Sequence, residues 1–382
     1  MRILAIDLAK ARSLACWYQA DDTTQEYRTV PTRPAEFHSL LSERPIDRVV
    51  IEICDAAGWV VDLCRTLGVE VQVANTNQQA WRWKNVKHKC DRGDALKLAR
   101  LSAMNQLSLV HVPAKPVREW RSLILYRHRL IDRRTSIRNA IHAILVAQGM
   151  AMPSRRSMWS DDALSKLRDL ARPLEECPME ELWRGHLQME LEQLDELCRR
   201  IIALDDKLDA IGAADARVRR LRTIPGVGPR LSELVVAMID DPHRFKSVRQ
   251  VSAYVGLVPR RYQSGAMDRS GRISKAGCGL LRKLLTEIAW GMLRHNAHGA
   301  AVFNRISKGQ KTRRKQAAVA LGRRVLCWCW AMLRDGSDWH VPTPRPQRDD
   351  AAMLPAPRPR RGGDAMPATM PQTIASALTA SG

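Results

Sequence analysis

Short apolar runs alternate with amphipathic stretches in the N-terminal part of the chain. The runs at residues 3–6 and 49–53 have the length and apolar character of buried strands, and an acid, Glu52, lies inside the second run. The whole pattern predicts strands at residues 3–7, 14–19, 27–30, 49–53 and 69–74, and helices at residues 34–43 and 56–67. Strands that alternate with helices in this way predict an α/β sheet with some parallel pairing.

From residue 113 the pattern changes to long helical repeats. Residues 113–148 interleave arginines with leucines and isoleucines, which predicts one long basic amphipathic helix. Residues 179–208 carry a leucine-rich seam at helical spacing, which predicts a second long helix. Because Met152-Pro153-Ser154 interrupts the pattern between them, we expect a helical hairpin or a coiled-coil arm.

A glycine-containing hairpin follows this predicted arm. Residues 224–230 read Ile-Pro-Gly-Val-Gly-Pro-Arg and precede an apolar run that reaches residue 239. Glycines let a backbone approach a phosphate, and the amides of a following helix N-terminus point outward. The segment resembles a helix-hairpin-helix, a sequence-independent nucleic-acid binder, with Gly226, Gly228 and Arg230 as candidate contacts. A plain tight turn between two helices is the alternative.

Residues 260–275 form a second basic segment, which we predict to be a loop. It contains the cations Arg260, Arg261, Arg272 and Lys275 and the serines at positions 264, 270 and 274. Such a loop can bind phosphate and do nothing more. One of its serines could also be a nucleophile if a base or a metal activates it, and the residue types alone do not choose.

The remaining pattern completes the domain organisation. A helix is predicted at residues 280–293 and another ends near residue 334, after which the chain becomes rich in Pro, Ala and Arg. We expect this last part to be disordered, because it has no apolar periodicity. The predicted domains are residues 1–112, an α/β domain completed by the following helix, 113–215, a helical arm, 216–336, a helical C-terminal domain, and 337–382, a disordered tail.

The charge of the chain changes the functional interpretation. The 382 residues contain 62 Lys and Arg against 40 Asp and Glu, a formal net charge of +22. This excess indicates a polyanionic partner, and nucleic acid is favoured over a membrane surface, because no apolar run reaches the ~18–20 residues that span a bilayer. The N-terminus does not have the pattern of a signal peptide, and the nine cysteines lack zinc spacing. We therefore expect a cytoplasmic protein with reduced thiols.

The arginines of the predicted basic helix are candidate contacts to a nucleic-acid backbone. A solvated helix face is the alternative, but these side chains face almost no acids in the local sequence. The set comprises Arg118, Arg121, Arg127, Arg129, Arg133, Arg134 and Arg138.

Four acidic residues are candidates for metal binding. Asp7 closes the first predicted strand, and Glu52 lies inside an apolar strand, where an unpaired carboxylate is costly. Asp91 and Asp94 are three residues apart at a predicted helix start and would share one face. If the two strands are neighbours and the helix packs beside them, the carboxylates meet and divalent ions would relieve their repulsion. The alternative for Asp91 and Asp94 is capping of the helix.

Taken together and in order, these segments resemble the transposases of the IS110 family of bacterial insertion sequences, which are related to the pilin-gene invertases. The resemblance runs from residue 1 to about residue 333. Its markers are Ala-Ile-Asp7, Val-Ile-Glu52, Asp91-x-x-Asp94-Ala, Ile-Pro-Gly226-Val-Gly228-Pro, Tyr-Val-Gly256-Leu-Val-Pro and Gln-Ser264-Gly, followed by Gly-Arg-Ile-Ser-Lys275.

The resemblance implies a fold and a chemistry. The N-terminal domain would have a ribonuclease-H fold like that of RuvC junction resolvases, with a DEDD site of Asp7, Glu52, Asp91 and Asp94. The site would bind Mg²⁺ or Mn²⁺, with two ions expected. The helical C-terminal transposase domain would supply Ser264 as the nucleophile. A structured non-coding bridge RNA would guide the protein to donor and target DNA, and a homodimer or homotetramer is expected.

These expectations define a metal-dependent, RNA-guided DNA recombinase that acts through a serine-linked intermediate. The first alternative is a metal-only, structure-selective nuclease of the junction-resolvase kind, which needs no serine. The second is a nucleic-acid-binding protein without enzymatic activity, in which the acids are helix caps and fold residues. A covalent protein–DNA adduct separates the first interpretation from both alternatives.

Overall fold

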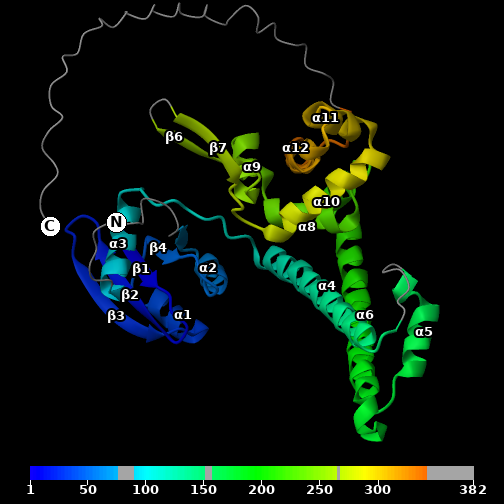
Figure 1. The fold of residues 1–382 in the computed structure, drawn as a ribbon. Helices are drawn as coiled ribbons and strands as arrows, with labels where there is room; N and C mark the ends of the chain where they lie inside the picture. The colour runs from blue at the N-terminus through cyan, green and yellow to red at the C-terminus, as the bar shows by residue number, and fades with distance from the viewer. Residues whose placement is uncertain (76–89, 151–156, 265–266, 342–382) are drawn as a thin grey trace, which may run out of the picture. The chain divides into compact units, whose positions relative to one another are not determined.

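The computed structural model describes residues 1–75, 90–150, 157–264 and 267–341 (Figure 1). Two sequence predictions lie outside these residues: the break at Met152-Pro153-Ser154 and nearly all of the tail from residue 337 onward. Among the described residues, no helix is long and apolar enough to cross a membrane.

The N-terminal part contains one five-stranded sheet. Its strands are β1 (Arg2–Asp7), β2 (Arg12–Gln19), β3 (Gln25–Pro31), β4 (Arg48–Glu52) and β5 (Glu70–Ala74). Their order is β3-β2-β1-β4-β5, in which β1 pairs antiparallel with β2 and β2 with β3, whereas β1 and β4, and β4 and β5, run parallel. The prediction of an α/β sheet with some parallel pairing is therefore confirmed.

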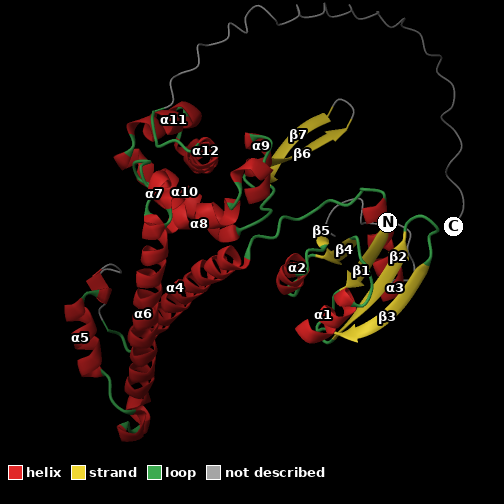
Figure 2. Cartoon of the chain, turned by 180° about the vertical axis from the view of Figure 1, so that it is seen from behind, coloured by secondary structure: helices red, strands yellow, loops and turns green. Residues whose placement is uncertain are grey.

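Helices cover both faces of this sheet (Figure 2). On one face, α1 (Pro34–Ser42) and α2 (Ala57–Thr66) pack on alternate strand residues such as Leu4 and Ile6. On the other face, α3 (Asp91–Ala103) packs on Ile3 and Ala5 of the same strand. Because both faces are buried, the strand reads in the sequence as one continuous apolar run.

The predicted arm is present as two long helices. Helices α4 (Lys115–Ala147) and α6 (Leu182–Ala214) lie side by side along part of their length (Figure 1), where Leu130 packs against Leu197 and Ile201. Helix α5 (Asp161–Leu170) packs on the same pair through Leu167. The first turns of α4 and the last turns of α6 belong to a different core, in the C-terminal part.

The C-terminal part is helical except for one β-ribbon. Its helices are α7 (Ala216–Leu221), α8 (Pro229–Ile239), α9 (Val248–Val255), α10 (Gly279–His295), α11 (Ala297–Ser307) and α12 (Arg314–Asp335). They share a single large apolar core that includes Cys329 of α12. The segment predicted as a loop at residues 260–275 is instead a two-stranded antiparallel ribbon of β6 (Pro259–Ser264) and β7 (Met267–Ile273). That prediction was wrong because the exposed strands carry no apolar alternation.

Candidate active site and nucleic-acid contacts

Asp7 and Glu52 come together at the carboxyl edge of the sheet. The parallel register pairs Ile6 of β1 with Ile51 of β4, which places Asp7 next to Glu52. Side chains alternate between the faces of a strand, so Asp7 lies on the same face as Ala5, which packs on α3. By the same alternation Glu52 shares the α3 face, since Val50 two residues earlier packs on that helix.

Helix α3 brings its two aspartates to this face. Ala95 and Leu98 are buried against the sheet, and Asp91 and Asp94 continue that stripe by one helical turn. The N-cap residue is Cys90, whose side chain makes no cap hydrogen bond, and Asp91 is already the first residue of the helix. The alternative in which Asp91 is the N-cap is therefore wrong, although carboxylates in a first turn still interact favourably with the helix dipole.

Lys97 connects the two groups of acids. Burial lowers the pKa of Lys97, while the negative charges of Asp94 and Glu52 act in the opposite direction. Both carboxylates therefore lie close enough to Lys97 to interact with one cation, although they are far apart in the sequence. The signal in the sequence for the contact with Asp94 is the i,i+3 spacing of the two residues on one helix.

The acids fit divalent ions by donor type and by placement on one edge. Carboxylate oxygens are the preferred ligands of Mg²⁺ and Mn²⁺. Asp7, Glu52 and Asp94 are half-buried and Asp91 is exposed. Within the described ranges, however, no three His, Cys, Asp or Glu side chains are close enough to hold a metal ion as they stand. Metal binding would therefore require these side chains to turn toward one another.

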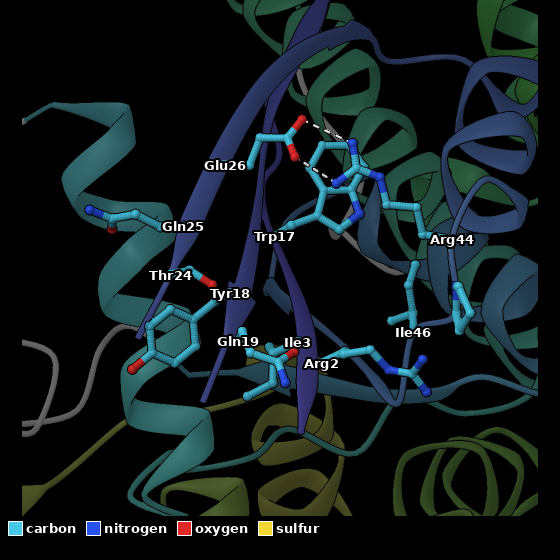
Figure 3. A pocket seen from close by; sticks show the side chains of 11 residues that line it. Arg2, Ile3, Trp17, Tyr18, Gln19, Thr24, Gln25, Glu26, Arg44 and Ile46 are labelled. Atoms are coloured by element: carbon cyan, nitrogen blue, oxygen red, sulfur yellow. Dashed lines mark hydrogen bonds and ion pairs between the residues drawn. The ribbon is translucent and has the colours of Figure 1, made fainter. Parts of the chain in front are cut away.

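A pocket of about 450 Å³ lies at the opposite edge of the sheet (Figure 3). It is lined by the start of β1, the end of β2 and the start of β3. Arg44 stacks on Trp17 there, 4.8 Å from the ring centroid, and is paired with Glu26 at 2.6 Å. The charge of Arg44 is already neutralised by Glu26, and the pocket is separate from the end of the sheet that carries Asp7 and Glu52. We therefore assign the pocket no part in the chemistry.

Ser264 is the last residue of β6 and is exposed near the tip of the ribbon. The base of the ribbon is tightly fixed: a Cβ on Gly256 or Gly277 would lie within 2.5 Å of the opposing backbone. Arg282 of α10 ties the same loop together by donating to the carbonyls of Val255 at 3.0 Å and Gly277 at 3.1 Å. The ribbon therefore projects from a rigid base and carries Ser264 at its far end.

The competing serines differ from Ser264. The Ser274 hydroxyl oxygen is buried and accepts or donates no hydrogen bond among the described atoms, so it is poorly placed to reach a large substrate. Ser274 is also not a helix cap, because α10 begins at Gly279 with Cys278 as its N-cap. In the ribbon register Ser270 pairs with Arg261.

Several arginines of α4 are engaged with protein groups. Arg118 pairs with Asp62, and Arg127 pairs with Asp205 at 2.6 Å. Arg121 donates to the carbonyls of Ala237 and Met238 at the end of α8. The expectation that this helix faces almost no acids is therefore wrong for Arg118 and Arg127.

The other candidate arginines of α4 lie farther along the arm. Arg138 stacks on Trp159, 4.8 Å from the ring centroid. Arg129 and Arg133 are exposed and Arg134 is half-exposed, which makes them the accessible cations of this set.

The glycine hairpin between α7 and α8 faces its own domain on one side. A Cβ on Gly226 would lie 3.3 Å from Met292 of α10, and Asn296 donates to the Pro225 carbonyl at 3.2 Å. Gly228 is the N-cap of α8 and has open space around it. Arg230 pairs with Asp209, and the Gly228 carbonyl accepts from the Ser232 amide at 3.2 Å inside α8. The open space beside Gly228 is therefore the candidate contact that this hairpin retains.

Arg230 belongs to a charged cluster where α4, α6 and α8 meet. It lies 3.4 Å from Asp205 and 3.1 Å from the fully buried Glu233. The pKa of Glu233 is raised to about 7, chiefly by burial; Arg230 and Arg127 act to lower it, and Asp209 and Asp205 act to raise it. Between about pH 4.5 and pH 7 the folded protein thus holds a proton that the unfolded chain has released. The free energy of unfolding should fall as pH rises through this window.

We expect Glu233→Gln to remove this pH dependence. The difference in unfolding free energy between pH 5 and pH 8 should shrink by about 2 kcal/mol, since a tenfold change in proton affinity corresponds to ~1.4 kcal/mol. Denaturant unfolding at the two pH values measures this difference, with Asp206→Asn as the control, since it removes an exposed carboxylate of the neighbouring helix α6. An unchanged difference in Glu233→Gln would mean that Glu233 titrates normally.

Comparison with known proteins identifies the family. One family model described as "Transposase", of the DEDD class of IS110 elements, matches residues 4–149. A second, the transposase IS116/IS110/IS902 family, matches residues 218–304. The first match covers the sheet, α3 and α4, and the second covers the glycine hairpin and the ribbon.

Curated relatives agree with these matches. A probable family 20 transposase of Pseudomonas aeruginosa is 30% identical over 304 residues, 78% of this chain and 87% of the relative. The transposase for insertion sequence element IS1111A of Coxiella burnetii is 28% identical over 335 residues, 87% of this chain and 90% of the relative. A pilin gene-inverting protein of Moraxella lacunata is 30% identical over 123 residues, 31% of this chain and 37% of the relative.

The fold and the matches define an enzyme of DNA transposition and recombination. The chain belongs to the IS110 family of transposases, which confirms the resemblance found in the sequence.

Proposed function

We propose that this transposase is an RNA-guided recombinase that exchanges DNA strands through a covalent link between Ser264 and DNA, with metal ions held by four acids. The observation that carries the proposal is the meeting of Asp7 and Glu52 on the face covered by α3, whose first turn bears Asp91 and Asp94. Lys97, which interacts with both Asp94 and Glu52, supports a shared site.

The sheet supports a ribonuclease-H-like, RuvC-like domain. The strand order β3-β2-β1-β4-β5, with β1 and β4 parallel and central, brings the ends of two acid-bearing strands together. A divalent ion bound there would polarise the scissile phosphate and stabilise the leaving oxygen. The four acids would bind that ion. When the ion is absent, Lys97 would partly balance the negative charge of the acids.

Ser264 is proposed as the nucleophile because its ribbon presents it to a large substrate. Arg260, Arg272 and Lys275 are exposed on the same ribbon and its base, where they can bind phosphate oxygens. Attack of the Ser264 oxygen on a phosphorus would form a phosphoserine ester and release one DNA hydroxyl. Attack by a second DNA hydroxyl on that ester would restore the serine, so strands are exchanged without free ends.

The proposed partners are donor and target DNA and a structured guide RNA. Base pairing with the RNA would select the DNA site. The protein would bind the nucleic-acid backbones through Arg129, Arg133 and Arg134, through the hairpin at Gly228 and through the ribbon. The net charge of +22 supports such an assembly. We propose a homodimer or homotetramer as the active form, acting in the cytoplasm.

Trapping of the intermediate tests this function. The full chain is incubated with DNA carrying the ends of its insertion sequence, with or without RNA transcribed from the flanking non-coding DNA, and with Mg²⁺ or a chelator. We expect a denaturation-resistant protein–DNA adduct only with metal and RNA, and peptide mapping should place it on Ser264. Cleaved DNA without an adduct would favour the metal-only nuclease, and binding without cleavage would favour the non-enzymatic protein.

A further inference from the structure

The β6–β7 ribbon has two distinct faces. Its register pairs Ser264 with Met267 and Tyr262 with Arg269, and residues directly opposite each other in an antiparallel pair share a face. Because side chains alternate along a strand, these four residues lie on one face. Gln263, which pairs with Asp268, lies on the other.

The second face is occupied by an internal ion pair. Arg261 donates to the two carboxylate oxygens of Asp268, from Nε at 2.8 Å and from Nη2 at 2.5 Å. That cation is neutralised, so Arg261 is a weaker candidate for phosphate binding than its position in the sequence predicted. Arg269, on the Ser264 face, remains exposed.

The Ser264 face exposes two large side chains with apolar surface. Tyr262 is 59% exposed and Met267 is 52% exposed. A two-stranded ribbon has no core of its own to bury an aromatic ring. Tyr262 stands two residues from Ser264, roughly 6.6 Å along the strand at 3.3 Å per residue. This face therefore presents the aromatic ring of Tyr262, the cation of Arg269 and the hydroxyl of Ser264 within about the length of one nucleotide.

We propose that Tyr262 stacks on the DNA base beside the scissile phosphate and that Arg269 binds a neighbouring phosphate, so that together they position the strand for Ser264. The proposal rests on Ser264 as the nucleophile. The occupant is a DNA strand, as the exposed cations of the ribbon and the +22 charge of the chain favour a polyanion. Stacking of a base on an aromatic side chain tolerates any sequence, which suits a protein whose specificity comes from pairing.

Tyr262→Ala should lower the rate of adduct formation about tenfold, since a base–aromatic stack contributes ~1–3 kcal/mol. Tyr262→Phe, which keeps the ring, should retain the wild-type rate. Gln263→Ala is the matched control, because Gln263 lies between Tyr262 and Ser264 in the strand but on the other face. This variant should also retain the wild-type rate of adduct formation. Arg269→Ala should weaken binding of the same DNA and lower the adduct rate.

An abasic substrate separates stacking from a structural effect. The base next to the scissile phosphate is removed, and adduct rates are compared for wild type and Tyr262→Ala. We expect the abasic site to slow the wild type about tenfold and to leave Tyr262→Ala almost unchanged, because both changes remove the same contact. Effects that multiply would overturn the stacking role. A loss of affinity for labelled guide RNA, with the adduct rate unchanged, would assign Tyr262 to RNA and also overturn it.

The outcome for wild type keeps this proposal distinct from the proposed function. If wild type forms no adduct at Ser264, the serine mechanism fails, and the positioning role fails with it. If wild type forms the adduct and Tyr262→Ala forms it equally fast, only the positioning role fails.

Discussion

Glu52→Gln and Asp91→Asn are each expected to abolish strand cleavage while leaving nucleic-acid binding largely intact. Loss of one ligand charge weakens metal affinity. Removing a residue that only hydrogen-bonds to a metal ligand typically lowers metal affinity or activity about 10–100-fold, so removing a ligand itself should lower the cleavage rate at least about a hundredfold. The proposed nucleic-acid contacts on α4 and on the ribbon do not involve these carboxylates, so binding should persist. Cleavage rates with Mg²⁺ and gel-shift affinities for DNA and RNA measure the two effects.

The control for these variants is Glu26→Gln, which removes a carboxylate of the same sheet at the pocket edge, away from α3. It should cleave DNA at the wild-type rate. Thermal unfolding of each variant shows whether the domain is intact. Near-wild-type cleavage by Glu52→Gln would remove Glu52 from the metal site, and loss of folding along with activity would instead make it a structural residue.

The N-terminal fold could be predicted well because its strands are buried on both faces. Leu4 and Ile6 face α1 and α2, while Ile3 and Ala5 face α3, so the whole run is apolar. The order of the strands could not be predicted in this way. Whether β1 lies beside β4 depends on a crossover through α1, and only that neighbourhood brings Asp7 to Glu52.

The basic residues show a limit of local pattern. Counting acids near the arginines in the sequence predicted free cations, but Arg127 meets Asp205 from another helix and Arg118 meets Asp62 from the N-terminal part. Such ion pairs form between segments that are distant in the chain, so the residue pattern within one helix cannot predict them. The same holds for Arg230, whose partner Asp209 lies on α6.

The ribbon escaped prediction for a related reason. Every residue of β6 is exposed, so no apolar alternation marks it as a strand. The side chains of β6 still alternate between the two faces of the ribbon, with Tyr262 and Ser264 on one face and Gln263 on the other. Recognising it required the register, which fixes which side chains accompany Ser264.

Ser264→Ala is expected to remove the covalent DNA adduct completely while binding of DNA and RNA persists. A serine hydroxyl is a poor nucleophile at neutral pH and needs activation. The nearest carboxylate on the ribbon, Asp268, is engaged by Arg261 on the other face, which argues against it as the general base. The activating group is therefore expected to come from the acidic edge of the sheet.

The adduct is measured by a denaturing gel and by peptide mapping. Ser274→Ala is the control and should keep the adduct, because the hydroxyl it removes is buried. An adduct that survives in Ser264→Ala, or that maps to another residue, would end this assignment. Retained affinity for DNA and RNA in the same variant would show that the lost adduct reflects chemistry rather than binding.

Mixing the two kinds of inactive protein tests where the acids and the serine of one site come from. Ser264→Ala retains the acids, and Asp91→Asn retains the serine. If a site is assembled from two protomers, a mixture contains some sites with both intact groups, and adduct formation should return to roughly a quarter of the wild-type level for random dimers. If both groups come from one chain, each site lacks one of them and the mixture stays inactive. Peptide mapping of any recovered adduct should find it only on the Asp91→Asn protein, because only that chain carries Ser264.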